Sequence, residues 1–190
     1  NGDRQELLAS ASGNLDRLAR WVDRGVRIVS GCSSCTYALK ATYPQLLGRD
    51  AKLAVSARKV ASNTYDIAEL LTGLLRFGNL NTQFTATSRK LAYHAPCHLK
   101  TQGIGRPWLR LLSQLPGVTI EDMQADCCGM AGTYGFKSEK YQIALDIGQD
   151  LFHRVTTYKP DFVVSECASC QMQIEHGTAV RALHPIEILH

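Results

Sequence analysis

Cysteine is the residue type in this 190-residue sequence that is best placed to do chemistry, since seven are present. They are Cys32, Cys35, Cys97, Cys127, Cys128, Cys167 and Cys170. Four of them form two C-x-x-C pairs and two are adjacent. No charged-then-apolar leader opens the sequence, so we do not expect secretion. Metal ligation or redox chemistry is then a better interpretation of the cysteines than a disulfide framework.

The more specific pattern consists of Cys97, the vicinal pair Cys127-Cys128, and the second C-x-x-C, Cys167 and Cys170. Each group follows an expected strand, and the carboxyl ends of parallel strands meet at the sheet edge where ligands bind. Several thiolates close together repel unless a cation holds them, which an iron–sulfur cluster or zinc would supply. A zinc ion needs only four ligands, and adjacent cysteines suit one tetrahedral ion poorly. We therefore favour iron–sulfur over zinc and over inert buried thiols.

The loops around these cysteines fit an anionic metal centre. Cys167 and Cys170 open an expected helix, whose free N–H groups and positive end would face the sulfurs. Gly129, Gly132 and Gly135 allow close backbone approach, with N–H groups directed inward.

Nearby polar residues have two interpretations each. His94 and His98 could hydrogen-bond a sulfur or relay a proton, or could be structural loop histidines. Lys100 and Arg106 could offset the charge of a cluster, but ordinary surface cations are the better interpretation. For His184 we favour a packed loop histidine.

These residues need a scaffold, and the hydrophobic pattern predicts an α/β fold with a largely parallel sheet and flanking helices. Expected helices cover residues 3–24, a segment up to about 47, most of 51–77, 106–115, 138–156 and a segment up to about 176. Expected strands cover 26–29, 91–94, 118–120 and 161–165. The Asn/Thr-rich segment 78–88 is interpreted as a linker.

An internal repeat supports two related units. Residues 29–35 and 164–170 match at five of seven positions, at an offset of 135 residues, and the preceding segments align at the same offset. Coincidence in a short motif is the alternative. A strand–C-x-x-C–helix unit used twice predicts domains at 1–85 and 86–190. The first unit would be N-terminally truncated, because counterparts of the front cysteines would precede residue 1. Cys32 and Cys35 would then be half of an incomplete site.

Four stretches make the sequence resemble the CCG cysteine-rich domain family, and within it the subunits that serve anaerobic glycerol-3-phosphate dehydrogenases. They are His94-Ala95-Pro96-Cys97-His98, residues 127–137, Cys167-x-x-Cys170 with Gln173-Ile174-Glu175, and His184-Pro185-Ile186. The resemblance implies two CCG units and a 4Fe-4S cluster, of the non-cubane type, held by the five cysteines of the second unit. It also implies electron transfer from flavin-bearing catalytic dehydrogenase subunits toward membrane quinone, on the cytoplasmic face of the cell membrane.

Two further interpretations stay open. One is a catalytic disulfide or quinone reductase that works at an exposed cluster. The other is a zinc-stapled scaffold that docks the catalytic subunits. No flavin fingerprint is present, so we expect this chain not to oxidise substrate by itself.

Composition narrows the classes of partner. A net charge of +4 with scattered basic residues argues against nucleic-acid binding. No apolar run reaches about 18 residues, so we expect no membrane span. The apolar stripe over residues 67–77 could lie on a membrane but is better explained as core, and we also expect burial of Trp21 and Trp108. For Tyr134, packing and shielding of a cluster are equal alternatives.

Overall fold

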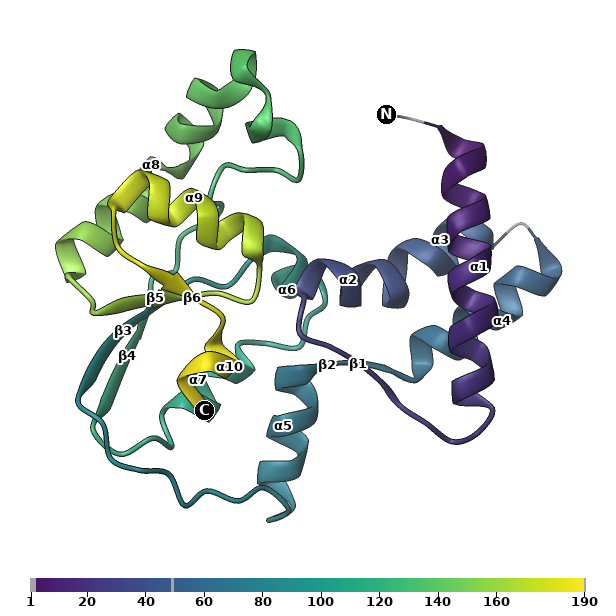
Figure 1. Cartoon of the computed structure of the whole chain (residues 1–190), viewed down its shortest axis with the longest axis horizontal. Coiled ribbons are helices and arrows are strands. Elements are labelled where there is room, and N and C mark those ends of the chain that lie inside the picture. Colours follow the sequence, from purple (N-terminus) through teal and green to yellow (C-terminus); the bar gives the residue numbers. More distant parts are fainter. Residues whose placement is uncertain (1–2, 49, 190) are drawn as a thin grey trace. The chain divides into compact units, whose positions relative to one another are not determined.

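The structure, a computed structural model, describes residues 3–48 and 50–189. It consists of two compact units, one up to Leu70 and one from Leu71 onward, which are described separately. Figure 1 shows the strands of both units with helices beside them, as the sequence predicts for an α/β protein. Among the described residues, no helix combines the length and the hydropathy that crossing a bilayer requires.

The first unit places helices against a two-stranded parallel sheet. Its elements are α1 (Arg4–Val22), β1 (Ile28–Ser30), α2 (Ser33–Tyr37), the π-helix η1 (Ala38–Thr42), α3 (Tyr43–Leu47), α4 (Ala51–Ser62), β2 (Thr64–Asp66) and α5 (Ile67–Arg76), which crosses the division. The Asp3 carboxylate begins α1 by accepting the N–H groups of Gln5 and Glu6. A small core forms where α1, α3 and α4 meet, around Leu15 and Leu47.

The expectation that residues 51–77 are mostly helical is confirmed, and the strand β2, which was not predicted, interrupts the helices. Asn63 ends α4, and Thr64 and Tyr65 follow it, both residue types that favour strands. The Thr64 hydroxyl donates to the Val60 carbonyl, which closes the last turn of α4. Three residues were too few for the periodicity of the surrounding helices to indicate a strand.

The second unit contains a four-stranded, all-parallel sheet in the order β4-β3-β5-β6. Its elements are β3 (Arg89–Tyr93), α6 (Cys97–Thr101), α7 (Pro107–Leu112), β4 (Val118–Asp122), the 3-10 turns η2 (Tyr134–Phe136) and η3 (Ser138–Lys140), α8 (Tyr141–Tyr158), β5 (Phe162–Val164), α9 (Ala168–Thr178), β6 (Ala182–Leu183) and α10 (Pro185–Leu189). In Figure 1, α8 and α9 lie on one side of the strands and α7 and α10 on the other. The core between the sheet and the α8–α9 layer includes Leu151, Val163, Ile174 and two cysteines, Cys128 and Cys170.

Most of this order agrees with the sequence analysis, while α6, β6 and α10 were not predicted. The segment 77–88 contains no helix or strand, in agreement with the predicted linker. β6 has only two residues, so it carries no periodicity of its own. It is held because Val163 N–H donates to Arg181 O and the Glu175 carboxylate accepts the Ala182 N–H.

The two C-x-x-C segments adopt the same local structure. Cys32 (φ −110°, ψ 115°) and Cys167 (φ −124°, ψ 113°) are each the extended residue that precedes a helix, after β1 and β5 respectively. The order helix–strand–helix also recurs around both, as α1, β1 and α2 in the first unit and as α8, β5 and α9 in the second. This is the arrangement that a repeat predicts. That the first unit is a truncated CCG unit, with a domain boundary after residue 85, stays a prediction.

Burial of the large apolar residues is only partly as expected. Trp108 is fully buried, whereas Trp21 is 52% exposed, with the Arg24 guanidinium 5.2 Å from the centroid of its ring. The expectation that Trp21 is buried is therefore wrong, because α1 turns Ala11 and Leu15 inward instead. The apolar stripe of α5 is half-buried, and Phe77 is 75% exposed, so the prediction of core is wrong for Phe77.

The two tryptophans give a matched test of this packing. We expect Trp108→Ala to lower the free energy of unfolding by about 3–5 kcal/mol, because it empties a fully buried site. Trp21→Ala should change it by less than about 1 kcal/mol, since that ring is already half in solvent. Urea unfolding followed by far-UV circular dichroism measures both, and equal losses would contradict the assigned burial.

Candidate metal centre

All five cysteines of the second unit follow the carboxyl ends of three neighbouring strands. β3 runs into Cys97, β4 into the loop that carries Cys127 and Cys128, and β5 into Cys167 and Cys170. β3 lies between β4 and β5 in the sheet. The three strand ends therefore meet at one edge, as expected for a ligand site in a parallel sheet.

The five sulfurs form one connected group. The Cys128 and Cys170 Sγ atoms lie 3.2 Å apart. Cys97 and Cys128 both hydrogen-bond to the Cys127 sulfur, and Cys170 bonds to both Cys128 and Cys167. The convergence predicted from the sequence is thus present, although Cys97 and Cys170 are far apart along the chain.

Hydrogen bonds between the sulfurs shift the pKa values of the cysteines in opposite directions. Thiol donation from Cys128, and then from Cys97, lowers the pKa of Cys127 to about 2, assisted by the Gly129 N–H at 3.3 Å from its sulfur. Donation to Cys127 raises the pKa of Cys128 to about 11. The pKa values of Cys97 and Cys170 are raised as well, each mainly by a hydrogen bond to a neighbouring cysteine. Of these four cysteines, only Cys127 is shifted toward the thiolate, and a bound cation would favour deprotonation of the other three.

His94 lies beside the two most buried sulfurs. Its imidazole is 1% exposed, and neither ring nitrogen has a hydrogen-bond partner in the structure. One of those nitrogens and the sulfurs of Cys128 and Cys170 all lie within 4.8 Å of one another. Burial lowers the pKa of His94 to about 4, and the positive charge of Lys100 acts in the same direction. The ring is therefore neutral at neutral pH, which is the form that binds metals.

The loop with the vicinal cysteines rests directly on α8. Gly129 has φ +90°, and a Cβ there would lie 1.8 Å from the Ala144 carbonyl oxygen. A Cβ at Gly148 would lie 2.7 Å from the Cys128 carbonyl oxygen. These two glycines permit backbone contact between loop and helix, and that contact fixes the positions of Cys127 and Cys128.

Two cationic side chains contact the segment that leads to the vicinal cysteines: Lys100 in α6 and Arg106, which follows α6. The Lys100 ammonium donates to the carbonyls of Ala125 (2.6 Å) and Asp126 (2.9 Å), directly before the vicinal cysteines. Arg106 pairs with Asp122 at 2.8 Å, at the end of β4. The expectation of an ordinary surface cation is therefore wrong for Lys100, which stabilises the segment that leads to the cysteines. It is confirmed for Arg106, which is exposed and forms a surface ion pair.

The remaining candidate residues lie as follows. Cys97 and His98 are exposed at the start of α6, so one side of the sulfur group reaches solvent. Gly132 is exposed, and no atom lies within 4 Å of where its Cβ would be. Cys32 and Cys35 lie in the first unit, where burial and a hydrogen bond to Cys32 raise the pKa of Cys35.

Tyr134 and His184 also have defined positions. Tyr134 is 36% exposed in η2, with the Lys140 ammonium 5.9 Å from its ring centroid. His184 is half-buried, accepts the Ile186 N–H through Nδ1 and packs edge-on against Trp108. The interpretation of His184 as a packed loop histidine is confirmed.

Sequence reasoning missed a buried polar pair beside the cysteines. The Tyr93 hydroxyl donates to the Glu166 carboxylate at 2.9 Å, and both residues are at most 1% exposed. Tyr93 directly precedes His94 and Glu166 directly precedes Cys167, so the pair joins the ends of β3 and β5. A glutamate next to a cysteine after a buried strand was the available signal, but its partner is 73 residues away.

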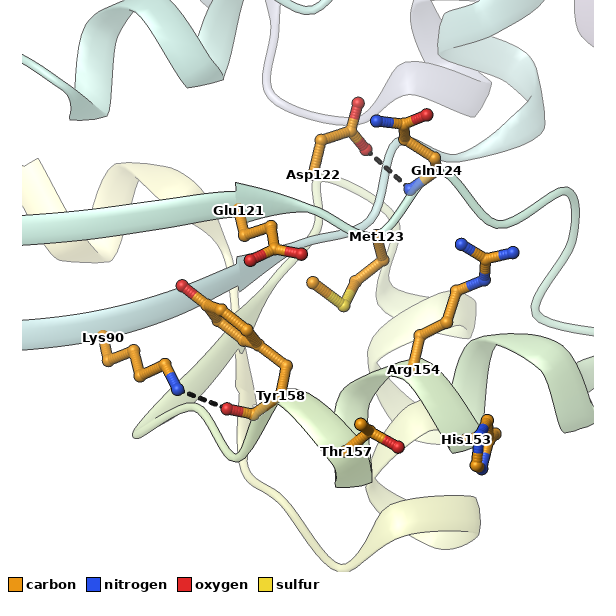
Figure 2. Close-up of a pocket in the computed structure, with 9 residues that line it drawn as sticks. All are labelled: Lys90, Glu121, Asp122, Met123, Gln124, His153, Arg154, Thr157 and Tyr158. Carbon is orange, nitrogen blue, oxygen red and sulfur yellow. Dashed lines mark hydrogen bonds between the residues drawn. The ribbon is translucent and has the colours of Figure 1, made fainter.

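A cavity of about 590 Å³ lies elsewhere in the second unit, between the end of β4 and α8 (Figure 2). Among its lining residues are Glu121, Arg154 and Lys90, whose ammonium donates to the Tyr158 carbonyl. As far as the described residues show, no cysteine lines it. The cavity is therefore separate from the sulfur group.

The donor set fits a bound metal centre. Five cysteine sulfurs and the neutral imidazole of His94 converge in a partly buried site, and neither nitrogen of that imidazole has a hydrogen-bond partner. Cysteine thiolates are the usual ligands of iron–sulfur clusters, and mixed cysteine–histidine sets also bind zinc.

Comparison with known proteins agrees with this chemistry. Residues 91–175 match the family model described as CCG, the cysteine-rich domain. The whole chain is 34% identical to a subunit of the anaerobic glycerol-3-phosphate dehydrogenase of Escherichia coli K12, and it covers 46% of that protein. It is 29% identical to the glycolate oxidase iron-sulfur subunit of the same organism, with 96% of this chain and 44% of that protein covered.

A third relative comes from Methanothermobacter marburgensis. It is a subunit of the CoM/CoB fumarate reductase and is 26% identical, with 94% of this chain and 35% of that protein covered. The chain thus spans between about a third and a half of the length of these three relatives.

Gly129 and Gly132 provide a test of how the loop is seated. Both have left-handed φ, but only Gly129 faces a backbone carbonyl. We expect Gly132→Ala to lower the free energy of unfolding by about 1 kcal/mol and Gly129→Ala by about 3 kcal/mol or more. Chemical unfolding of the protein as purified measures both, and equal effects would show that contact with α8 does not position the loop.

Removing the ammonium of Lys100 tests the second anchor. We expect Lys100→Met to lower the free energy of unfolding by about 2 kcal/mol, because two carbonyls lose a charged donor. The exposed Lys137→Met is the matched control and should stay within about 0.5 kcal/mol. Thermal and urea unfolding report the difference, and a neutral Lys100→Met would contradict the anchoring role.

Proposed function

Because residues 91–175 belong to the CCG cysteine-rich domain family, we propose that this chain binds an iron–sulfur cluster and is an electron-transfer subunit of an oxidoreductase. The observation that carries the proposal is the contact among five cysteine sulfurs from three strand ends. Such a group suits a cationic inorganic centre, because a bound cation offsets the charge repulsion among neighbouring thiolates. When bound, the cluster supplies one-electron transfer.

The proposed ligands are Cys97, Cys127, Cys128, Cys167 and Cys170, with a four-iron cluster of the non-cubane type as the expected form. The chain's own residues hold these ligands in place. Gly129 seats the loop on α8, Lys100 clamps the carbonyls before the vicinal pair, and the Gly129 N–H donates to the Cys127 sulfur. Hydrogen bonds of this kind to sulfur tune the reduction potential of a cluster.

The physiological role we propose is passage of electrons from a flavin-bearing glycerol-3-phosphate dehydrogenase toward membrane quinone, at the cytoplasmic face of the membrane. The similarity over the whole chain to the subunit of the anaerobic glycerol-3-phosphate dehydrogenase supports this choice among the dehydrogenases. Cys97 is exposed, which gives electrons a short path between the centre and a docked partner. The chain itself is proposed not to oxidise the substrate.

One observation favours a second candidate, a zinc-stapled docking scaffold. The ligand atoms of His94, Cys128 and Cys170 are close enough for a single tetrahedral ion, and Cys167 contacts Cys170 as a fourth donor. Two sulfurs, those of Cys97 and Cys127, would then have no metal, which makes zinc the weaker proposal.

Anaerobic purification followed by metal analysis separates the two. We expect brown protein with a broad band near 400 nm and iron with acid-labile sulfide in comparable amounts. Cys128→Ser should lose most of the iron, because it removes a buried sulfur at the centre of the group. Cys35→Ser should keep it, since Cys32 and Cys35 contribute only two thiols in the first unit.

Colourless protein with one zinc per chain would support the scaffold and exclude the electron-transfer role. Loss of iron from Cys35→Ser, at unchanged far-UV circular dichroism, would instead add the first unit's cysteines to the proposed ligands.

A further inference from the structure

We infer that His94 is a ligand of the metal centre, an imidazole in addition to the cysteine sulfurs. This rests on the proposed function and goes beyond it, because the proposed ligand set consists of cysteines alone. The inference follows from where His94 lies, from what surrounds its ring and from what its nitrogen offers a metal.

The fold places His94 in the middle of the sulfur group. It is the first residue after β3, the strand between β4 and β5. The neighbouring strand ends lead to the vicinal cysteines on one side and to the second C-x-x-C on the other. The backbone of His94 is fixed there, since its N–H donates to the Val164 carbonyl at 3.0 Å.

The ring is directed at the two deepest sulfurs. Its ligand nitrogen and the sulfurs of Cys128 and Cys170 lie within 4.8 Å of one another, and both cysteines are at most 3% exposed. Ligands of one metal site have mutual distances of this order. Cys97 and His98, by contrast, lie at the exposed side of the group.

The protein around the His94 ring does not satisfy its polar atoms. Both ring nitrogens are buried and neither has a hydrogen-bond partner, although buried polar groups in proteins are nearly always paired. The neighbouring polar residue Tyr93 uses its hydroxyl on Glu166 instead. A metal bound through one ring nitrogen would supply that nitrogen with the partner that the protein alone does not give it.

A histidine ligand would also change the chemistry of the centre. A neutral imidazole adds no negative charge to a site that already gathers five sulfurs, so it supplies a further ligand without adding to the repulsion among them. In other iron–sulfur centres, replacement of cysteine ligands by histidine raises the reduction potential. The direction of that shift gives a readout that a purely structural histidine would not produce.

The direct test uses protein labelled with ¹⁵N-histidine, purified without oxygen and brought to its paramagnetic state. Pulsed electron paramagnetic resonance should show the large hyperfine coupling of a directly bonded nitrogen. His94→Ala should abolish that coupling and lower iron retention by about 10- to 100-fold. The exposed His153→Ala, on α8, is the matched control and should leave both unchanged.

A second variant covers the case in which His94→Ala does not fold. His94→Cys keeps a metal ligand, and we expect it to retain iron, to lose the nitrogen coupling and to shift the reduction potential downward. Retention of the wild-type potential by His94→Cys would overturn the inference.

The outcomes separate the two proposals. Iron and sulfide without a large nitrogen coupling in the wild-type protein would overturn the ligand role of His94 and leave the electron-transfer function standing. Purification with zinc alone would overturn the proposed function. In that case, zinc-edge X-ray absorption with one nitrogen ligand, lost in His94→Ala, would still support the site, and sulfur ligands only would overturn it.

Discussion

Contact among like ionisable groups is the constraint on which the second unit depends. A thiol is stable next to another thiol, but a second thiolate beside the first is opposed by charge repulsion and by burial. The pKa of Cys127, lowered to about 2, and that of Cys128, raised to about 11, are two sides of this one contact. The five sulfurs at this sheet edge therefore stay mostly protonated in the protein alone, and the proposed cationic centre would remove the repulsion among their thiolates.

That constraint explains why the surrounding backbone is fixed so closely. The vicinal cysteines lie in a loop without regular structure, so neither a helix nor a strand positions them. Backbone contact of Gly129 with α8 and the Lys100 ammonium on two loop carbonyls take over that task. The first contact restricts the loop from the α8 side, and the second ties it to α6. Both contacts lie within a few residues of the ligands, where a small displacement would separate the sulfurs.

The sequence predicts the parts of this site that have a local signature. Cysteines after apolar segments, and glycines beside them, indicated strand ends and close backbone approach, and the parallel sheet then required convergence. What it could not predict depends on distant contacts. The Tyr93–Glu166 pair and the Lys100 clamp each join residues 25 or more positions apart. The strands β2 and β6 are too short to show a period. Trp21 is exposed because α1 packs through Ala11 and Leu15, which helical spacing alone does not reveal.

The two C-x-x-C corners share one local structure but differ in the strands that lie beside them. Cys32 and Cys167 share the same backbone conformation before a helix, so the corner itself is equally well formed in both units. The difference lies in the neighbouring strands. Beside β5 stands β3, which brings His94 and Cys97, and beyond it β4, which brings the vicinal pair, whereas in the described part of the first unit the sheet consists of β1 and β2. A corner of this kind supplies two sulfurs and a helix N-terminus. In the proposed centre, the ends of β3 and β4 supply the further ligands that the corner by itself does not provide.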